Sequence, residues 1–295
     1  MEAYLDNSAT TRCSKAAADM VYKLLTEDYG NPSSLHMKGV EAENYINDAK
    51  KKIAKTLRVQ DKEILFTSGG TESNNTAIIG AVMANKRAGR HIITSSVEHA
   101  SVLSVMQFLE EQGFEITYLP VNHDGVISVE ELKNAVREDT ILVSLMHVNN
   151  EIGAVMPIEE AGAAIKEKNP AVFFHVDAIQ SYGKLEIRPK RMNIDMLSVS
   201  GHKIHGPKGS GFLYIKDKTK IKPIIYGGGQ QKGMRSGTEN VPAYAGLGVA
   251  AEEIYTDFDK KTAHMYELRD HFIESVQRID GVSVNGRTDH TNAPH

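Results

Sequence analysis

The chain has 295 residues, 41% hydrophobic and 24% charged, which is the composition of a globular protein with a sizeable core. Its net charge of −4 gives no basic surface for nucleic acid or an anionic membrane, and no apolar run is long enough to span a membrane. No signal peptide is expected, and the single cysteine, Cys13, excludes an intrachain disulfide. These features predict a cytoplasmic protein.

Short β-rich runs alternate with helical patterns along most of the chain. Most of the runs are continuously apolar, as expected of strands buried on both faces. Strands are predicted at residues 63–67, 91–95, 115–119, 141–147, 172–176, 196–200 and 211–215. Helices are predicted at residues 71–87, 100–112, 128–136 and 158–168. This repetition predicts an α/β fold with a largely parallel sheet.

A longer helical stretch, residues 242–278, is followed by a short strand-like run at 282–284. We interpret this part as the beginning of a second, smaller domain. One helix and one strand make a poor domain, and the sequence stops soon afterward in a polar segment. We therefore expect that the chain is cut short at its C-terminus.

Ligands bind at the carboxyl ends of the strands in open α/β sheets, so the residues that follow each strand matter most. The first predicted strand is followed by Gly69-Gly70-Thr71, where the backbone and a helix N-terminus suit a phosphate, although a plain tight turn would use the same residues. The second is followed by His99, which more often caps or packs than catalyses. The fourth is followed by Asn149 and Asn150, which a simple turn would also explain.

The fifth and sixth predicted strands end in the most informative residues. Asp177 ends the apolar fifth strand, where a carboxylate needs a buried partner, in a structural salt bridge or a binding site. Lys203 follows the sixth strand, flanked by Ser200 and His202. Lysine forms Schiff bases, and desolvation lowers its pKa toward reactivity. The alternative is a Gly/Pro loop that happens to contain basic residues.

Together these residues meet the demands of pyridoxal 5′-phosphate (PLP). This cofactor needs a lysine for its aldehyde, a carboxylate for its pyridinium nitrogen, a phosphate cup and a flat group above the ring. Lys203 and Asp177 supply the first two, and His99 is a candidate for stacking and proton transfer. The candidates for the phosphate cup are Gly70, Thr71, Ser200 and His202. No metal site is expected.

Eight segments in order resemble the NifS/IscS-type cysteine desulfurases of the class V aminotransferase superfamily. They are residues 4–11, 29–34, 68–75, 98–99, 149–153, 200–209, 227–230 and 235–240. The resemblance implies the PLP-dependent transferase fold type I, with a mostly parallel central sheet flanked by helices, and a homodimer. It implies an N-terminal segment (1–14) packing with the small domain, a large PLP-binding domain (15–250) and the beginning of a small α+β domain (251–295).

The resemblance also assigns roles. It makes Lys203 the PLP-binding lysine, pairs Asp177 with the pyridinium and lets Gln180 donate to the phenolic oxygen of the ring. It also implies that Asn150 contacts the cofactor and that His99 stacks and moves protons. The implied phosphate ligands are Gly70, Thr71, Ser200 and His202, with Thr238 reaching in from the other subunit, and Asn31 is expected near the substrate.

The implied reaction converts L-cysteine to L-alanine and leaves a persulfide on an enzyme cysteine. The sulfur then goes to an iron–sulfur scaffold or a tRNA-thiolation protein. In the family the nucleophilic cysteine and an arginine for the substrate carboxylate lie well after the Thr238 region, and this sequence contains neither. Cys13 lies where the family pattern has no nucleophile, so we expect a chain that binds PLP but is inactive by itself.

Two other interpretations remain open at this point. One is another fold-type I PLP enzyme, either a class V aminotransferase or a selenocysteine lyase. The other is a non-catalytic PLP-stabilised dimer or partner-binding module, which the missing thiol and arginine would favour.

Overall fold

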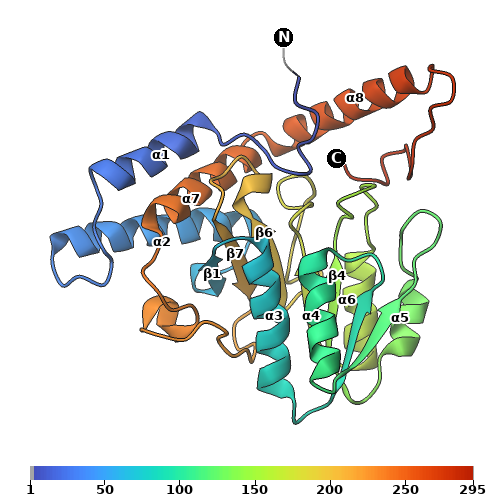
Figure 1. Ribbon diagram of the computed structural model, residues 1–295, viewed down its shortest axis with the longest axis horizontal. Coiled ribbons are helices and arrows are strands. Elements are labelled where there is room, and N and C mark those ends of the chain that lie inside the picture. The colour runs from blue at the N-terminus through green and yellow to red at the C-terminus, as the bar shows by residue number, and fades with distance from the viewer. Residues whose placement is uncertain (1–2, 295) are drawn as a thin grey trace.

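Helices cover both faces of a seven-stranded sheet in the computed structural model, which describes residues 3–294 (Figure 1). The strand order is β1-β7-β6-β5-β4-β2-β3, with β7 antiparallel to both β1 and β6 and every other pair parallel. The strands are β1 Ile64–Thr67, β2 His91–Ser95, β3 Glu115–Leu119, β4 Thr140–Met146, β5 Phe173–Asp177, β6 Met196–Ser200 and β7 Gly211–Ile215. Each of the predicted strands is found, with ends shifted by at most one residue, and the α/β fold is confirmed.

The helices form two layers on the sheet. Side chains of α3 and α4 pack on one face, whereas α2, α6 and α7 pack on the other. The helices are α1 Lys15–Thr26, α2 Met37–Leu57, α3 Gly70–Asn85, α4 Ala100–Glu111, α5 Val129–Ala135, α6 Ile158–Lys168, α7 Val241–Tyr255 and α8 Phe258–Val276, with short 3₁₀ turns η1 Asp61–Glu63, η2 Gly201–Lys203 and η3 Gln230–Gly233. Helices α1 and α2 were not among the predicted elements.

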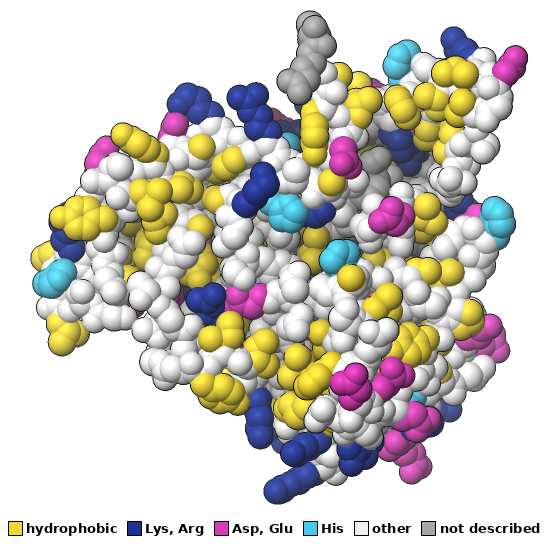
Figure 2. All heavy atoms as spheres, viewed as in Figure 1, with side chains coloured by type: hydrophobic (Ala, Val, Ile, Leu, Met, Phe, Trp, Pro, Cys, Tyr) yellow, Lys and Arg dark blue, Asp and Glu magenta, His cyan; other side chains and the backbone are white. Residues whose placement is uncertain are grey.

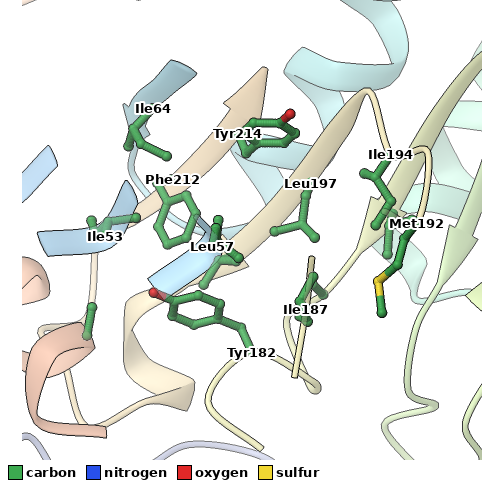
Figure 3. Close-up of a cluster of buried hydrophobic side chains, with 14 of the residues drawn as sticks. Ile53, Leu57, Ile64, Tyr182, Ile187, Met192, Ile194, Leu197, Phe212 and Tyr214 are labelled. Carbon is green, nitrogen blue, oxygen red and sulfur yellow. The ribbon is translucent and has the colours of Figure 1, made fainter. Parts of the chain in front are cut away.

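The core divides along the alternation of side chains in the strands. Ile93 contributes to the cluster shared with α2, α6 and α7, whereas its neighbour Ile92 belongs to the cluster shared with α3 and α4. Figure 3 shows part of the first cluster, where Leu57 of α2 lies close to Tyr182 and Phe212. Because both faces of each central strand are covered, the polar groups at the strand ends are held in a rigid frame.

Two features of the C-terminal region differ from the sequence prediction. The stretch 242–278 is two helices, because Asp257 adopts φ +53° and interrupts the backbone hydrogen bonding between α7 and α8. Residues 282–284 form no strand, because no strand of the described residues lies beside them to satisfy their N–H and C=O groups. The predicted division into residues 1–14, 15–250 and 251–295 stays a prediction.

The last described residues return to the sheet. Arg269 of α8 donates to the carbonyl oxygens of Asn292 and Ala293, at 3.2 Å each. Asn292 Nδ2 donates to the carbonyl of Ile152 (3.1 Å), and the N–H of Ala293 donates to the carbonyl of Gly153 (3.0 Å). The C-terminal segment is thereby fastened to the loop that follows β4. Among residues 3–294, none of the helices is both long and apolar enough to cross a bilayer.

Candidate active site

A cavity of about 510 Å³ opens at the carboxyl ends of β4, β5 and β6. The first turns of α3 and α4 and the N-terminal segment complete its walls. Its lining includes the sequence-predicted residues Gly70, Thr71, His99, Asn150, Asp177, Gln180, Ser200, His202 and Lys203. The fold therefore gathers residues from six separate segments of the chain into one polar pocket.

Lys203 lies in η2, directly after β6. Its Nζ donates to the carbonyl oxygen of Ser8 and to that of Ala9, the latter at 2.9 Å. Burial lowers the pKa of Lys203, while the carboxylates of Asp6 and Asp177 oppose this shift. A lysine amine in this position reaches its neutral, nucleophilic form more readily than a solvated lysine does.

Asp177 is buried at the end of β5. Its Oδ2 accepts from Asn74 Nδ2 (2.8 Å) and its Oδ1 accepts from the N–H of Ile179 (2.9 Å). Burial raises the pKa of Asp177, and these two donors oppose the shift. No cationic side chain of residues 3–294 lies within ion-pair distance of this carboxylate. A cationic group bound in the cavity would form an ion pair with the Asp177 carboxylate.

A glycine-containing turn connects β1 to α3. Gly69 has φ +151°, which side-chain-bearing residues rarely adopt, and a Cβ on Gly70 would lie 2.1 Å from Ile179 Cδ1. The first N–H groups of α3 point outward with the positive end of the helix dipole. Ser200 and His202 line the same cavity, and His202 Nδ1 lies 3.1 Å from Thr10 Oγ1. The turn therefore suits a phosphate or another compact anion.

His99 is both a helix cap and a cavity residue. Its Nδ1 accepts a hydrogen bond from the N–H of Ser101 at 3.1 Å, at the start of α4. Because Nδ1 is an acceptor, the proton of the neutral ring resides on Nε2. The capping role that the sequence left open is therefore present, and the same hydrogen bond fixes the tautomer of a ring that lines the cavity.

Two amides complete the predicted wall. Gln180 Nε2 donates to the carbonyl of Ser8 at 3.0 Å, and Gln180 Oε1 accepts from Lys184 Nζ at 3.4 Å. Asn150 Nδ2 donates to Glu151 Oε1 at 2.6 Å on the loop after β4. Both amides are thus held by neighbours while lining the cavity.

Two predicted site residues lie outside this cavity. Asn31 is exposed between α1 and α2, where its Oδ1 accepts from the N–H of Ser33 (2.9 Å). Thr238 is also exposed, in a loop that Arg235 fastens to Glu72 at the start of α3 (3.0 Å). Within a single chain neither residue meets the cavity lining, and their roles remain predictions.

Some residues of the site were missed by reasoning from the strand ends. Asp6, Ser8 and Ala9 line the cavity because the N-terminal segment crosses Lys203, a long-range contact with no local sequence signal except the resemblance of residues 4–11. Glu98, next to His99, is buried and accepts from Ser95 Oγ (2.5 Å) and from the N–H of Met146 (3.0 Å). Burial raises the pKa of Glu98 to about 8, so this side chain is protonated at neutral pH.

The comparisons with known proteins agree with this architecture. Residues 3–295 match the family model described as aminotransferase class-V. A cysteine desulfurase IscS of Methanosarcina thermophila is 48% identical over 96% of this chain and 70% of its own. A solved structure titled NIFS-like protein superposes with a TM-score of 0.97 at 39% identity, over 100% of this chain and 80% of the other. A structure titled SspA in complex with cysteine gives a TM-score of 0.88 at 38% identity, over 97% and 82%.

The chain belongs to the aminotransferase class-V family, which the family match, the sheet order and the pocket at the strand ends define together. The extent and identity of the matches place it further within that family. Its branch is that of the cysteine desulfurases of the NifS/IscS type.

Proposed function

We propose that the chain binds PLP through Lys203 and acts as a cysteine desulfurase. The observation that carries the proposal is the buried carboxylate of Asp177, which lacks an ion-pair partner among residues 3–294 and faces the same cavity as Lys203. A protonated pyridine nitrogen is the cation that would satisfy it. The named relatives favour this reaction over that of an aminotransferase or a selenocysteine lyase.

The other residues of the cavity fit the remaining parts of PLP. The start of α3 offers N–H groups to a phosphate, and Ser200 and His202 lie on the same wall. Gln180 presents an amide to the cavity, and His99 presents a ring. PLP, when bound, supplies an electron sink for negative charge that develops at the substrate Cα.

The protein's own groups hold and move the protons of the reaction. Lys203 Nζ takes the Cα proton, because burial favours the neutral amine. The carboxylate of Asp177 keeps the ring nitrogen protonated. His99 Nε2 carries a proton that it can return to carbon, since its Nδ1 is occupied by Ser101. The C–S bond of cysteine breaks as a thiolate forms an S–S bond, so that alanine and a persulfide result.

The sulfur-accepting thiol is not expected to be Cys13. Cys13 does not line the cavity, and burial raises the pKa of its thiol, which disfavours the nucleophilic thiolate. Cys13 is also the one cysteine in the sequence. Turnover by this chain would therefore depend on a thiol supplied from outside it. The expected acceptor of the sulfur is an iron–sulfur scaffold or a tRNA-thiolation protein in the cytoplasm.

A homodimer is part of the proposal. Thr238 is exposed outside its own cavity, as a residue reaching a second subunit would be.

Hydrophobic side chains also gather over α1, α2 and their connection (Figure 2). Those exposed there include Tyr22, Leu25, Tyr29, Leu35, Met37 and Val40. Exposed apolar patches of this kind mark protein interfaces, and light scattering of the purified chain would measure the expected mass of two copies.

Absorption spectroscopy tests the cofactor and its lysine. The purified chain with added PLP is expected to show a visible band from lysine-bound PLP, and Lys203→Ala is expected to abolish it. Lys208→Ala is the matched control, because Lys208 is exposed in the same loop and does not line the cavity. L-cysteine should then change the band and, with excess dithiothreitol, release L-alanine. No band in the unmodified chain at saturating PLP would disprove the proposal.

A further inference from the structure

Lys184 is a half-buried lysine behind the cavity wall that the proposed reaction does not use. It lies in the turn after β5, and it is absent from the cavity lining. Burial, together with the charge of Lys203, lowers the pKa of Lys184 to about 8. No carboxylate of residues 3–294 lies within ion-pair distance of its ammonium. Its ammonium donates to the amide oxygen of Gln180, at 3.4 Å.

The backbone places Lys184 beside Gln180. Gly183 has φ +84°, and its N–H donates to the hydroxyl of Tyr255 (3.2 Å). A Cβ at Gly183 would lie 2.7 Å from Ile254 Cδ1, so this position has no room for a side chain. The N–H of Lys184 donates to the carbonyl of Ser181 (3.0 Å) and closes the turn. The turn at Gly183 and the hydrogen bond from Lys184 to Ser181 therefore place the lysine beside Gln180.

The two partners of the Gln180 amide select one of its two orientations. The carbonyl of Ser8 can only accept, and it receives Nε2 at 3.0 Å. The ammonium of Lys184 can only donate, and it faces Oε1. Reversing the amide would place NH₂ against an ammonium and one oxygen against another. Both contacts would be repulsive in a buried region, where polar mismatches are costly.

We propose that Lys184 is a positioning residue that locks the Gln180 amide with its donor end, Nε2, on the cavity side. The inference rests on the proposed PLP site, in which an anionic oxygen of the ring requires a donor from this wall. In the cofactor-free protein the carbonyl of Ser8 occupies that donor. Lys184 acts on the cofactor through Gln180 and does not touch it.

The first test uses the protein without cofactor. The exchange of the Gln180 side-chain amide hydrogens with water is followed by NMR on glutamine-¹⁵N-labelled protein, and Gln180→Met identifies the signal. Lys184→Met, which removes the donor and keeps the length, is expected to speed exchange about fivefold, the ratio for loss of one ordinary hydrogen bond. Lys184→Arg keeps donors at this position and should stay near the unmodified rate. Lys184→Leu replaces Lys184→Met if that variant does not fold.

The second test measures the PLP dissociation constant by equilibrium dialysis. Lys184→Met should weaken binding about fivefold in the unmodified background, and it should have almost no further effect in Gln180→Met. Unchanged amide exchange, or an equal loss of PLP affinity in both backgrounds, would overturn the inference. Failure of the unmodified chain to bind PLP would overturn the proposed function instead, and the exchange measurement would still decide whether Lys184 orients Gln180.

Discussion

Replacing Asp177 by asparagine should stabilise the cofactor-free protein and weaken PLP binding. Asparagine keeps an acceptor for the N–H of Ile179. Asn74 has a buried Oδ1 without a partner, so its amide can turn to accept from the new Nδ2, while the hydroxyl of Ser101 rotates to donate. The substitution therefore removes a buried charge, while Asn74 Nδ2 replaces Asn74 Oδ1 as the buried atom without a partner.

The magnitude follows from opposing contributions. An ion buried without a counter-charge costs several kcal/mol, and each of its two hydrogen bonds returns about 1.5–3 kcal/mol. We expect Asp177→Asn to raise the unfolding free energy by about 1 kcal/mol near pH 8, or about 2 °C in Tm for a chain of this size. Since burial raises the pKa of Asp177 in the folded state, this gain should shrink as the pH falls toward the ordinary value of 3.8.

Urea unfolding measures the expected gain in stability of Asp177→Asn, and PLP titration measures its expected loss of affinity. Loss of the charged partner should cost about 2 kcal/mol of PLP affinity, or roughly 30-fold. Asp195→Asn is the contrasting control, because Asp195 is buried but paired with Lys166 (2.6 Å) and Lys216 (3.3 Å), and its loss should destabilise by about 3 kcal/mol. A destabilised Asp177→Asn, or one that binds PLP as tightly as the unmodified chain, would refute the reasoning.

Three other perturbations follow from the structure. Because burial raises the pKa of Glu98 to about 8, the unmodified chain should lose stability relative to Glu98→Gln as the pH rises from about 5 through 8 in urea unfolding; a difference between the two that does not change with pH would contradict it. In thermal unfolding, Gly183→Ala should lower the free energy of unfolding by about 2 kcal/mol, because its Cβ would meet Ile254. Gly209→Ala, with φ +73° but open space around it, should lower it by about 1 kcal/mol, and equal losses would count against the contact with Ile254. Arg269→Ala should speed proteolysis within residues 286–294, and unchanged cleavage would show that its hydrogen bonds do not hold this segment.

The sheet could be predicted because its strands carry their own signal. Runs such as Met196–Ser200 are apolar and bounded by turn residues, so their limits are local properties. The amphipathic helices α1 and α2 were not predicted, because their many charged residues resemble a loop. Their apolar faces are buried against α7, a contact that is distant in sequence. The strand expected at 282–284 was wrong because a strand also requires a partner, which a local pattern does not reveal.

The site was predictable to the extent that it sits on strand ends. Asp177 and Lys203 each terminate an apolar run, and the parallel sheet brings such ends together. The carbonyl groups of Ser8 and Ala9 could not be inferred in the same way, because backbone atoms carry no residue signature. Lys184 resembled an ordinary surface lysine in sequence, and its partial burial beside Gln180 follows the turn at Gly183.

The position of β7 has a consequence for synthesis of the chain. Strand β1 lies at the sheet edge and pairs with β7 alone, yet β7 follows it by roughly 150 residues, about 8–30 s at usual translation rates. During that interval the apolar run Ile64-Leu65-Phe66 has no native strand beside it. A nascent chain of this protein therefore carries β1 without a paired strand, beside the turn that precedes α3, until β7 leaves the ribosome. Chaperones that hold unfolded chains would be needed most in this window.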